Sequence, residues 1–229
     1  MSRIFLSEWR KPWIKKEPAS KKKSRTAIVV ARLKKAYPNA KIVLRYGNDI
    51  QLLVAVILSA QCTDKKVNEV TEKLFKKYRT AQDFAKASLR TLEREVQQTG
   101  FYHAKARSIK TACRLIVERF GGKLPQTMDE ILQLRGVARK TANVVLGNAF
   151  GIVEGIAVDT HVRRLAQRLG LTRQDQPEKI EQDLMALVAK KDWFRLTYLL
   201  IEHGRVVCTA QKPNCAGCVL GDVCPSSRV

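Results

Sequence analysis

The sequence predicts an all-α protein. Apolar residues recur at helical spacing through most of the chain, helix start and stop signals separate these segments, and no run alternates with period two for long enough to indicate a sheet. The spacing begins at about Thr26 and is clearest over residues 67–78 and 109–120. With 229 residues, the chain can bury a core as one domain or as two small ones.

The first strong element is the apolar stretch Leu52–Leu58. We expect a fully buried helix there, because the stretch runs on into polar residues without a Gly or Pro turn signal. Extended to Ala60, it is still far too short to cross a bilayer, which predicts a soluble protein without a membrane partner. Cys62 and Cys113 lie within or beside apolar helices and are expected to be core residues.

Turn and cap residues predict the boundaries of later helices. Gly121-Gly122 and Gly170 are expected to end helices, Thr127-x-x-Glu130 predicts a capping box, and Pro177 opens a helix. These signals locate the ends of helices and the starts of others. The backbone N–H groups in the first turn of a helix have no partner within that helix.

One pair of helices is joined by a tight turn. A short helix is expected to end at Leu134, Gly136 turns the chain, and a second helix begins near Arg139. The free N–H groups and the positive dipole end of such a helix are a ready site for a phosphate. On spacing alone, a helix-hairpin-helix that grips a DNA backbone and an ordinary helix–turn–helix corner are equally good interpretations.

Two residues near this turn have the chemistry of a catalytic site. Lys140 lies in the first turn of the second helix, where the helix dipole and any burial favour the neutral amine over the ammonium. A neutral amine is a nucleophile that can attack a sugar carbon and form a Schiff base. Asp159 occupies an N-cap position, which capping alone explains, although a rigidly held carboxylate could also stabilise positive charge developing on a sugar.

The chain carries 43 Lys and Arg against 21 Asp and Glu, a formal charge of +22. This surplus indicates an anionic partner, and nucleic acid is the first choice because each neutralised phosphate releases counterions. Charge alone does not separate DNA from RNA, from an anionic membrane surface or from a merely basic protein. Residues 1–26 contain the run Lys21-Lys22-Lys23 and no apolar period. We expect a flexible basic arm there, which either raises non-specific affinity for phosphates or is a solvated tail.

Four cysteines close the sequence with the spacing C-x6-C-x2-C-x5-C: Cys208, Cys215, Cys218 and Cys224. Zinc ribbons and fingers usually pair two close knuckles across a longer loop, whereas one C-x2-C with wider flanking gaps suits four thiolates around a cubane cluster. The spacing favours a [4Fe–4S] cluster, with a structural zinc ion as the alternative. A disulfide is less favoured, because the charged N-terminus contains no secretory signal and a reducing compartment is expected.

Together these segments resemble the endonuclease III family, which are DNA glycosylases of the helix-hairpin-helix superfamily with an iron–sulfur cluster. The resemblance spans about residues 27–224 and is carried by four stretches: Leu58–Asp64, Thr99–Ala106, Leu134–Val145 with Ile156–His161, and the cysteine run. It implies two domains. Residues 42–153 would form a six-helix domain with the hairpin, and residues 27–41 plus 154–229 would form the domain with the cluster.

The resemblance also implies roles for single residues. Lys140 matches the Schiff-base nucleophile, and Asp159 matches the carboxylate that assists cleavage of the glycosidic bond. Gln61 matches the residue that fills the space left by a flipped nucleotide, and Phe101 matches a wedge position usually held by an aliphatic residue, with simple packing as its alternative. The four cysteines match the cluster ligands. The remaining implied DNA-binding residues are those of the hairpin and one histidine: Arg135, Gly136, Val137, Ala138, Arg139 and His161.

A lysine at position 140 implies the bifunctional type of enzyme in this family. Such an enzyme excises oxidised pyrimidines and then cleaves the strand at the abasic sugar by β-elimination, in base excision repair. The alternatives are a catalytically weak DNA-binding scaffold protein and a monofunctional glycosylase that acts on mismatches or purines. The implied partner is double-stranded DNA with damaged bases or abasic sites, bound by a monomer in the cytoplasm, on the nucleoid if the source is bacterial.

The hairpin departs from the family pattern Leu-Pro-Gly-Val-Gly-Arg-Lys at Arg135 and Ala138. The methyl group of Ala138 would lie where the backbone approaches a phosphate, and it would penalise a left-handed backbone there. We therefore expect a distorted or weaker grip, partly compensated by Arg135 and the basic arm.

Overall fold

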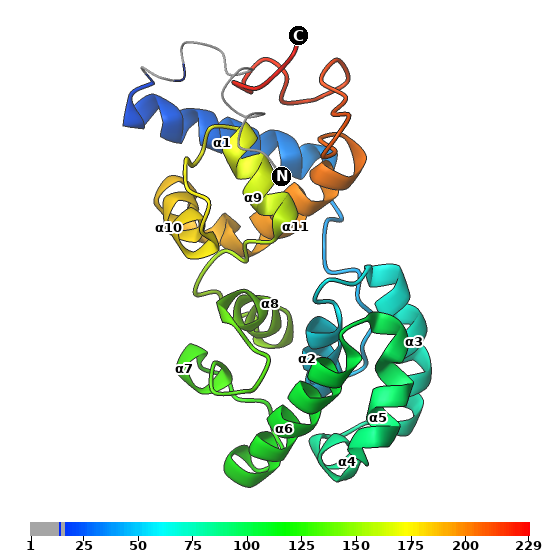
Figure 1. Cartoon of the computed structure of the whole chain (residues 1–229). Helices are drawn as coiled ribbons and strands as arrows, with labels where there is room; N and C mark the ends of the chain where they lie inside the picture. The colour runs from blue at the N-terminus through cyan, green and yellow to red at the C-terminus, as the bar shows by residue number, and fades with distance from the viewer. Residues whose placement is uncertain (1–13, 15–16) are drawn as a thin grey trace. The chain divides into compact units, whose positions relative to one another are not determined.

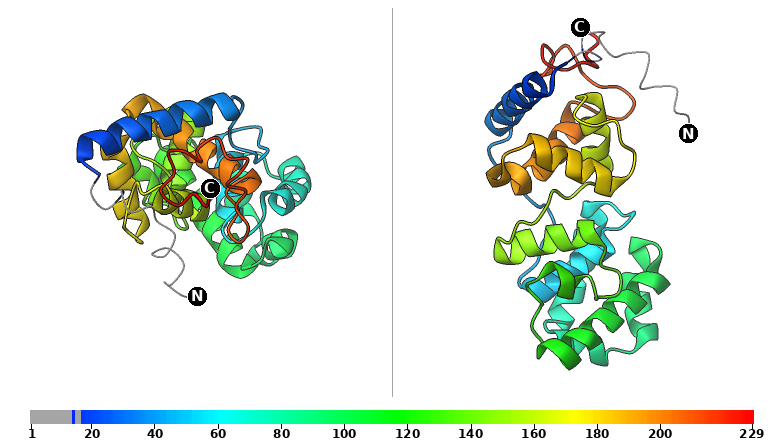
Figure 2. Two further views of the ribbon diagram at one scale, coloured as in Figure 1. Left: turned by 90° about the horizontal axis from the view of Figure 1, so that it is seen from above. Right: turned by 90° about the vertical axis from the view of Figure 1, so that its left-hand side faces the viewer.

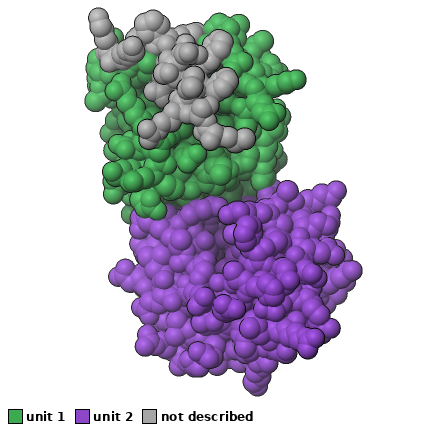
Figure 3. Space-filling model, viewed as in Figure 1, with its two compact units in different colours: residues 1–41, 155–229 green, residues 42–154 purple. Residues whose placement is uncertain are grey.

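Every regular element that the structure describes is a helix (Figure 1), which confirms the predicted all-α class. The computed structural model describes residue 14 and residues 17–229. The chain divides into two compact units, which we treat separately: unit 1 is Met1–Lys41 with Gly155–Val229, and unit 2 is Ile42–Glu154 (Figure 3). The division lies one residue from the expected boundary, since Glu154 belongs to unit 2.

Unit 2 is built around the apolar helix α2. All of Leu52–Leu58 is buried, which confirms the predicted buried helix. Helices α3, α6 and α8 contact α2, while α4 and α5 pack against α6. The elements in order are α2 (Asp49–Leu58), α3 (Asp64–Lys77), α4 (Ala81–Lys86), α5 (Leu89–Val96), η3 (Gln97–Thr99), α6 (Tyr102–Phe120), α7 (Met128–Ile131) and α8 (Arg139–Phe150).

Unit 1 joins the two ends of the chain. Helix α1 contacts α11, and α9 packs against both α10 and α11 around a shared apolar core. Residues 207–229, which follow α11, contain no helix and form the loop drawn in red in all views of Figures 1 and 2. The elements in order are α1 (Ala19–Ala36), α9 (Thr160–Arg168), α10 (Pro177–Leu187), η4 (Lys190–Asp192) and α11 (Trp193–Val206).

The expectation of a flexible arm through residue 26 was wrong from residue 19 onward, where α1 begins. Lys, Ala and Arg are strong helix formers, so the missing apolar period does not prevent a helix. Polar contacts fix the segment instead. Arg25 is buried, its Nε lies 2.7 Å from a carboxylate oxygen of Glu17, and its Nη1 donates to the carbonyl of Leu169 at 2.7 Å. Residues 1–13, 15 and 16 of the expected arm lie outside the described residues.

Most predicted cap signals are confirmed. Gly121 (φ 61°) follows the end of α6, Gly170 follows the end of α9, and α10 begins at Pro177. The hydroxyl of Thr127 accepts from the N–H of Glu130 as predicted, but the Glu130 carboxylate accepts from that hydroxyl instead of completing the box at the backbone. The complete box lies at Thr80 and Asp83, which open α4.

The two cysteines outside the terminal run differ. Cys113 is fully buried in α6, and this burial raises the pKa of its thiol to about 12, which confirms a core residue. Cys62 is only half-buried, in the turn after α2, so the core expectation was wrong for Cys62. None of the helices that the structure describes is both long enough and apolar enough for a membrane span.

Candidate functional site

The hairpin of unit 2 connects α7 to α8. Gly136 has φ 84°, and a Cβ atom there would lie 2.8 Å from Cβ of Ser108 on α6. The turn therefore requires glycine both for its backbone conformation and for its close packing on α6. The N–H of Val137 donates to the carbonyl of Leu134 at 3.1 Å, and both side chains are buried, which anchors the turn to the core. Helix α8 begins at Arg139, as predicted.

Ala138 is the N-cap residue of α8, with φ −100° and ψ 171°. Any residue adopts this extended conformation, so the predicted left-handed penalty at Ala138 was wrong. Its side chain makes no capping hydrogen bond, and an alanine has no atom with which to make one. Arg135, Gly136 and Ala138 are exposed and Arg139 is half-buried, so the turn offers its backbone to solvent at the positive end of α8.

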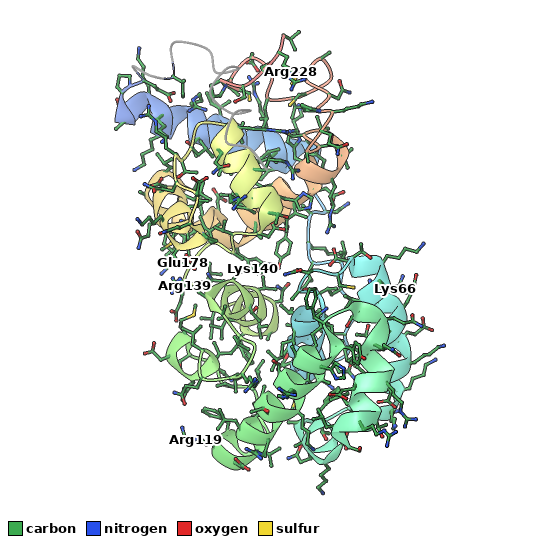
Figure 4. The ribbon with its side chains drawn as sticks, viewed as in Figure 1. Lys66, Arg119, Arg139, Lys140, Glu178 and Arg228 are labelled. Atoms are coloured by element: carbon green, nitrogen blue, oxygen red, sulfur yellow. The ribbon has the colours of Figure 1, made fainter. Side chains whose placement is uncertain are left out.

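Lys140 is the second residue of α8 and is exposed (Figure 4). The predicted position of Lys140 in the first turn of α8 is therefore confirmed, whereas its side chain is not buried in this structure. The helix that carries Lys140 is well fixed, because Ala142, Val145 and Leu146 in its next turns are fully buried. The Lys140 side chain is thus free to move in solvent, while the helix that carries it is held in place by the core.

Asp159 is the N-cap residue of α9, and its Oδ1 accepts from the N–H of Val162 at 2.8 Å, which confirms the predicted cap. The preceding segment Ile156–Val158 is buried, and the hydroxyl of Thr197 on α11 donates to the carbonyl of Ala157 at 3.2 Å. The half-buried carboxylate is thus held on a rigid support in unit 1.

His161 lies one residue into α9 and is half-buried. Its Nδ1 is 3.3 Å from Nη2 of Arg164, which also donates to the carbonyl of Gly204 at 2.9 Å. A Cβ at Gly204 would lie 2.9 Å from that Nδ1, so the ring is packed tightly against α11. These contacts hold the ring of His161 in place near the start of α9.

Gln61 and Phe101 share an unusual backbone conformation. They are the only residues other than glycine with positive φ in the described part of the chain, at 51° and 48°. Left-handed backbone costs an L side chain about 1–2 kcal/mol, and such strain gathers at functional sites. Both side chains are exposed, Phe101 by 66%, so simple packing does not explain Phe101.

The four terminal cysteines line one cavity of about 540 Å³ in unit 1. They are half-buried, and α9 and α11 supply part of the cavity wall through residues such as Leu165, Arg168 and His203. Among the described residues, no three His, Cys, Asp or Glu side chains are grouped closely enough to hold one metal ion. Four thiols spread around a cavity of this size suit a cluster of several iron atoms more than a single ion.

Hydrogen-bond donors approach two of these sulfur atoms. Nη1 of Arg168 donates to Sγ of Cys208 at 3.3 Å, the N–H of Leu220 donates to Sγ of Cys218 at 3.4 Å, and Nε2 of His203 lies 3.5 Å from the latter sulfur. Such donors stabilise thiolates and tune a bound metal. Sequence reasoning missed Arg168, because only the packing of α9 brings it to a cysteine forty residues away.

Burial within the cavity affects the thiols themselves. It raises the pKa of Cys224 to about 11, and binding of a metal by this thiol requires the loss of its proton. The pKa of Cys218 is also raised by burial, although the N–H of Leu220 opposes the shift.

Comparison with known proteins covers both units. Residues 54–190 match the model of HhH-GPD superfamily base excision DNA repair proteins, and residues 208–224 match the iron-sulfur binding domain of endonuclease III. The endonuclease III of Synechocystis sp. is 52% identical over 92% of this chain and 95% of its own length, and that of Bacillus subtilis is 45% identical over 82% and 86%. The structure of a trapped endonuclease III–DNA covalent intermediate is 41% identical and matches with a TM-score of 0.85 over 88% of this chain and 95% of that one.

These matches decide between the two metal centres that the cysteine spacing left open. The second match begins at Cys208 and ends at Cys224, and the protein carries a [4Fe–4S] cluster. The first match covers more than half of the chain and includes the hairpin, Lys140 and Asp159. The chain therefore belongs to the HhH-GPD superfamily of base excision DNA repair proteins and, within it, to the endonuclease III family.

Proposed function

We propose that Lys140 and Asp159 carry the chemistry of this enzyme. As a member of the endonuclease III family, the protein is a DNA glycosylase with abasic-site lyase activity and acts in base excision repair. The observation that carries the residue assignment is Lys140, an exposed amine in the first turn of α8, directly after a turn that offers its backbone to solvent. The relative trapped as a covalent intermediate with DNA supports a nucleophilic amine.

Lys140 acts through its neutral amine. The nitrogen attacks C1′ of the target nucleotide while the C1′–N bond breaks, and the base leaves with the bonding electrons and takes up a proton. Opening of the sugar ring gives a Schiff base at C1′. Loss of a proton from C2′ then expels the 3′ phosphate by β-elimination, and hydrolysis of the Schiff base frees the lysine.

Asp159 assists the first of these steps. A carboxylate held rigidly near the sugar stabilises the positive charge that develops as the base departs. The cap at Val162 uses one oxygen of Asp159, Oδ1, in the hydrogen bond described above. The other oxygen is the one that we assign to the sugar.

The remaining assignments concern DNA. Residues 135–139 bind one phosphate backbone through the N–H groups at the start of α8, with Arg135 and Arg139 adding charge, and His161 orients the start of α9 toward the substrate. Gln61 fills the space of the flipped nucleotide, and Phe101 wedges between bases of the opposite strand. We assign oxidised pyrimidines and abasic sites in duplex DNA as substrates of a monomeric enzyme that works in the cytoplasm.

Cys208, Cys215, Cys218 and Cys224 are the proposed cluster ligands. With four protein ligands, the cluster leaves no position for substrate, so its contribution is to hold residues 207–229 in shape for DNA binding.

Borohydride trapping tests the nucleophile. The wild-type protein should form a covalent adduct with abasic-site duplex, and Lys140→Ala should form none. Lys65→Ala is the matched control, because Lys65 is also the second residue of a helix in unit 2 and is also exposed. An adduct that survives in Lys140→Ala, or that is lost equally in Lys65→Ala, contradicts the assignment. Failure of the wild-type protein to form an adduct while it still binds DNA would favour the scaffold or the monofunctional alternative, which release of free base distinguishes.

Two substitutions separate capping from chemistry at Asp159. Asparagine caps a helix as well as aspartate does, whereas alanine costs about 1 kcal/mol. Asp159→Asn should therefore keep wild-type thermal stability and lose most base-excision activity. Asp159→Ala should lose the same activity and also lower the thermal stability. Unchanged excision in Asp159→Asn would reduce this residue to a cap.

A further inference from the structure

We propose that Lys105 is a positioning residue that holds the Gln61 turn and the Phe101 turn together as one rigid device for insertion into DNA. The inference rests on the proposed roles of Gln61 and Phe101. In this inference Lys105 does not contact DNA. It sets the distance between Gln61 and Phe101 and the direction in which their side chains point.

The contacts of Lys105 reach both turns. Its side chain extends from α6 and the residue is only 5% exposed. The ammonium donates to the carbonyl of Leu58 at 2.8 Å and to the carbonyl of Thr99 at 2.6 Å. Leu58 is the last residue of α2 and Thr99 is the last residue of η3, so the cation meets the negative end of two helical elements at once.

Each of these carbonyls lies just before a strained residue. Gln61 is three residues after Leu58, and Phe101 is two residues after Thr99, with Gly100 (φ 69°) between them. A left-handed residue other than glycine persists only where its surroundings determine the backbone. One buried ammonium therefore joins the only two such turns in the described part of the chain, although they lie forty residues apart in sequence.

A buried ammonium is costly to the fold by itself. Burial lowers the pKa of Lys105. An apolar side chain of similar length would fill the same space without the cost of desolvation. The buried charge is therefore explained by a need to fix the backbone before Gln61 and Phe101. Side chains held in place in advance bind DNA without a further loss of entropy.

Lys110 provides a matched control on the same helix. Its ammonium donates to the carbonyls of Ala85 and Ala87, both at 2.6 Å, at the end of α4. Like Lys105, Lys110 is a lysine of α6 that binds two carbonyls. No left-handed residue other than glycine follows Ala85 or Ala87 in that turn, however. Loss of either ammonium should affect stability, and only the loss of Lys105 should affect insertion.

The experiment compares Lys105→Met with Lys110→Met in the full-length, cluster-loaded protein. Affinity is measured for a duplex with a tetrahydrofuran abasic analogue and for the same duplex undamaged, and 2-aminopurine opposite the analogue reports unstacking. Because base stacking on a side chain is worth about 1–3 kcal/mol, Lys105→Met should lower the preference for the abasic duplex by about tenfold and reduce the fluorescence gain. Binding to undamaged duplex should stay unchanged, and Lys110→Met should keep the preference. Lys105→Arg, which keeps the cation, should restore most of it.

A Gln61→Ala/Phe101→Ala variant separates this inference from the one on which it rests. If that variant keeps the preference, insertion itself is wrong, and the role of Lys105 falls with it. If the variant loses the preference while Lys105→Met behaves like Lys110→Met, insertion stands and the inference about Lys105 is overturned. Adding Lys105→Met to the Gln61→Ala/Phe101→Ala variant should have no further effect, since all three act as one device. Should Lys105→Met fail to fold, Lys105→Gln takes its place in the same comparison.

Discussion

The two units differ in the cations that bind their backbone carbonyls. In unit 2 two lysines, Lys105 and Lys110, bind carbonyls at helix ends, within a bundle that is mostly regular helix. In unit 1 arginines bind the carbonyls of the irregular segment 207–229: Arg32 binds Val219, Arg164 binds Cys208, and Arg168 binds Thr209 and Ala210. A guanidinium fork reaches several acceptors in a fixed plane, whereas an ammonium is a compact charge. The irregular segment is thus bound by several guanidinium groups, whereas each of the two lysines binds two carbonyls at a helix end as a point charge.

The cavity lined by the four cysteines lies in unit 1, so we expect loss of the cluster to destabilise unit 1 only. Cys218→Ser should remove the cluster and leave the arginine contacts as the main support of residues 207–229, which then lose their protection from hydrogen exchange. Protection in unit 2 should stay at the wild-type level, because none of its helices contributes to the cavity. Exchange measured peptide by peptide, with absorbance near 400 nm as the assay for the cluster, checks both parts. Equal loss of protection in both units would end the distinction.

Arg25→Met tests the arginine contacts of unit 1. The substitution leaves the buried carboxylate of Glu17 without its cation and the carbonyl of Leu169 without its donor. Breaking a buried pair from one side costs about 4 kcal/mol, so denaturant unfolding followed in unit 1 should shift by that order. The double substitution Arg25→Met/Glu17→Gln should recover part of the loss. A shift below about 1 kcal/mol would mean that the pair behaves as a surface ion pair.

Leu53→Ala makes the corresponding test in unit 2. Leu53 is fully buried in α2, and truncation of a buried leucine costs about 3 kcal/mol through lost burial and a residual cavity. The unfolding free energy of unit 2 should fall by that amount, while the absorbance of the cluster in unit 1 persists. Bleaching of the cluster under native conditions would instead show that the units are not energetically separable.

Ala138→Gly is expected to have the smallest effect. It removes the methyl group at the N-cap of α8, which should bring a phosphate closer and tighten binding to abasic-site DNA a few-fold. Because φ at Ala138 is −100°, the wild-type backbone is unstrained. Glycine costs about 0.5 kcal/mol through greater freedom of the unfolded chain but is a better N-cap residue than alanine, so the unfolding free energy should change little. Affinity that is unchanged or lower would contradict the idea that this methyl group weakens the hairpin.

Local patterns in the sequence predicted much of the fold and part of the site. The buried helix α2, the start of α8 at Arg139 and the cap at Asp159 each depend on a few neighbouring residues, so short-range rules were sufficient. The end of α7 was predicted less well, because the chain leaves the helix at Ile131 and continues in turns to Leu134.

Features that depend on distant contacts could not be predicted in this way. The start of α1 depends on Arg25 meeting residues of α9, and the conformations of Gln61 and Phe101 depend on packing around α6. At Ala138 the sequence predicted a strained backbone that the structure does not have. A glycine in the family pattern suggested a left-handed residue, whereas the turn places its positive φ at Gly136 alone.

The assembly of unit 1 from both ends of the chain sets an order of events during synthesis. Unit 2 is complete once residue 154 has left the ribosome and can fold at once. Val29, Val30 and Leu33 of α1, however, pack against Leu199, Leu200 and Leu220, and must wait as exposed apolar side chains until nearly the whole chain has emerged. The four cysteines follow α11 in the sequence, so the cavity that they line can form only after residue 224 has emerged.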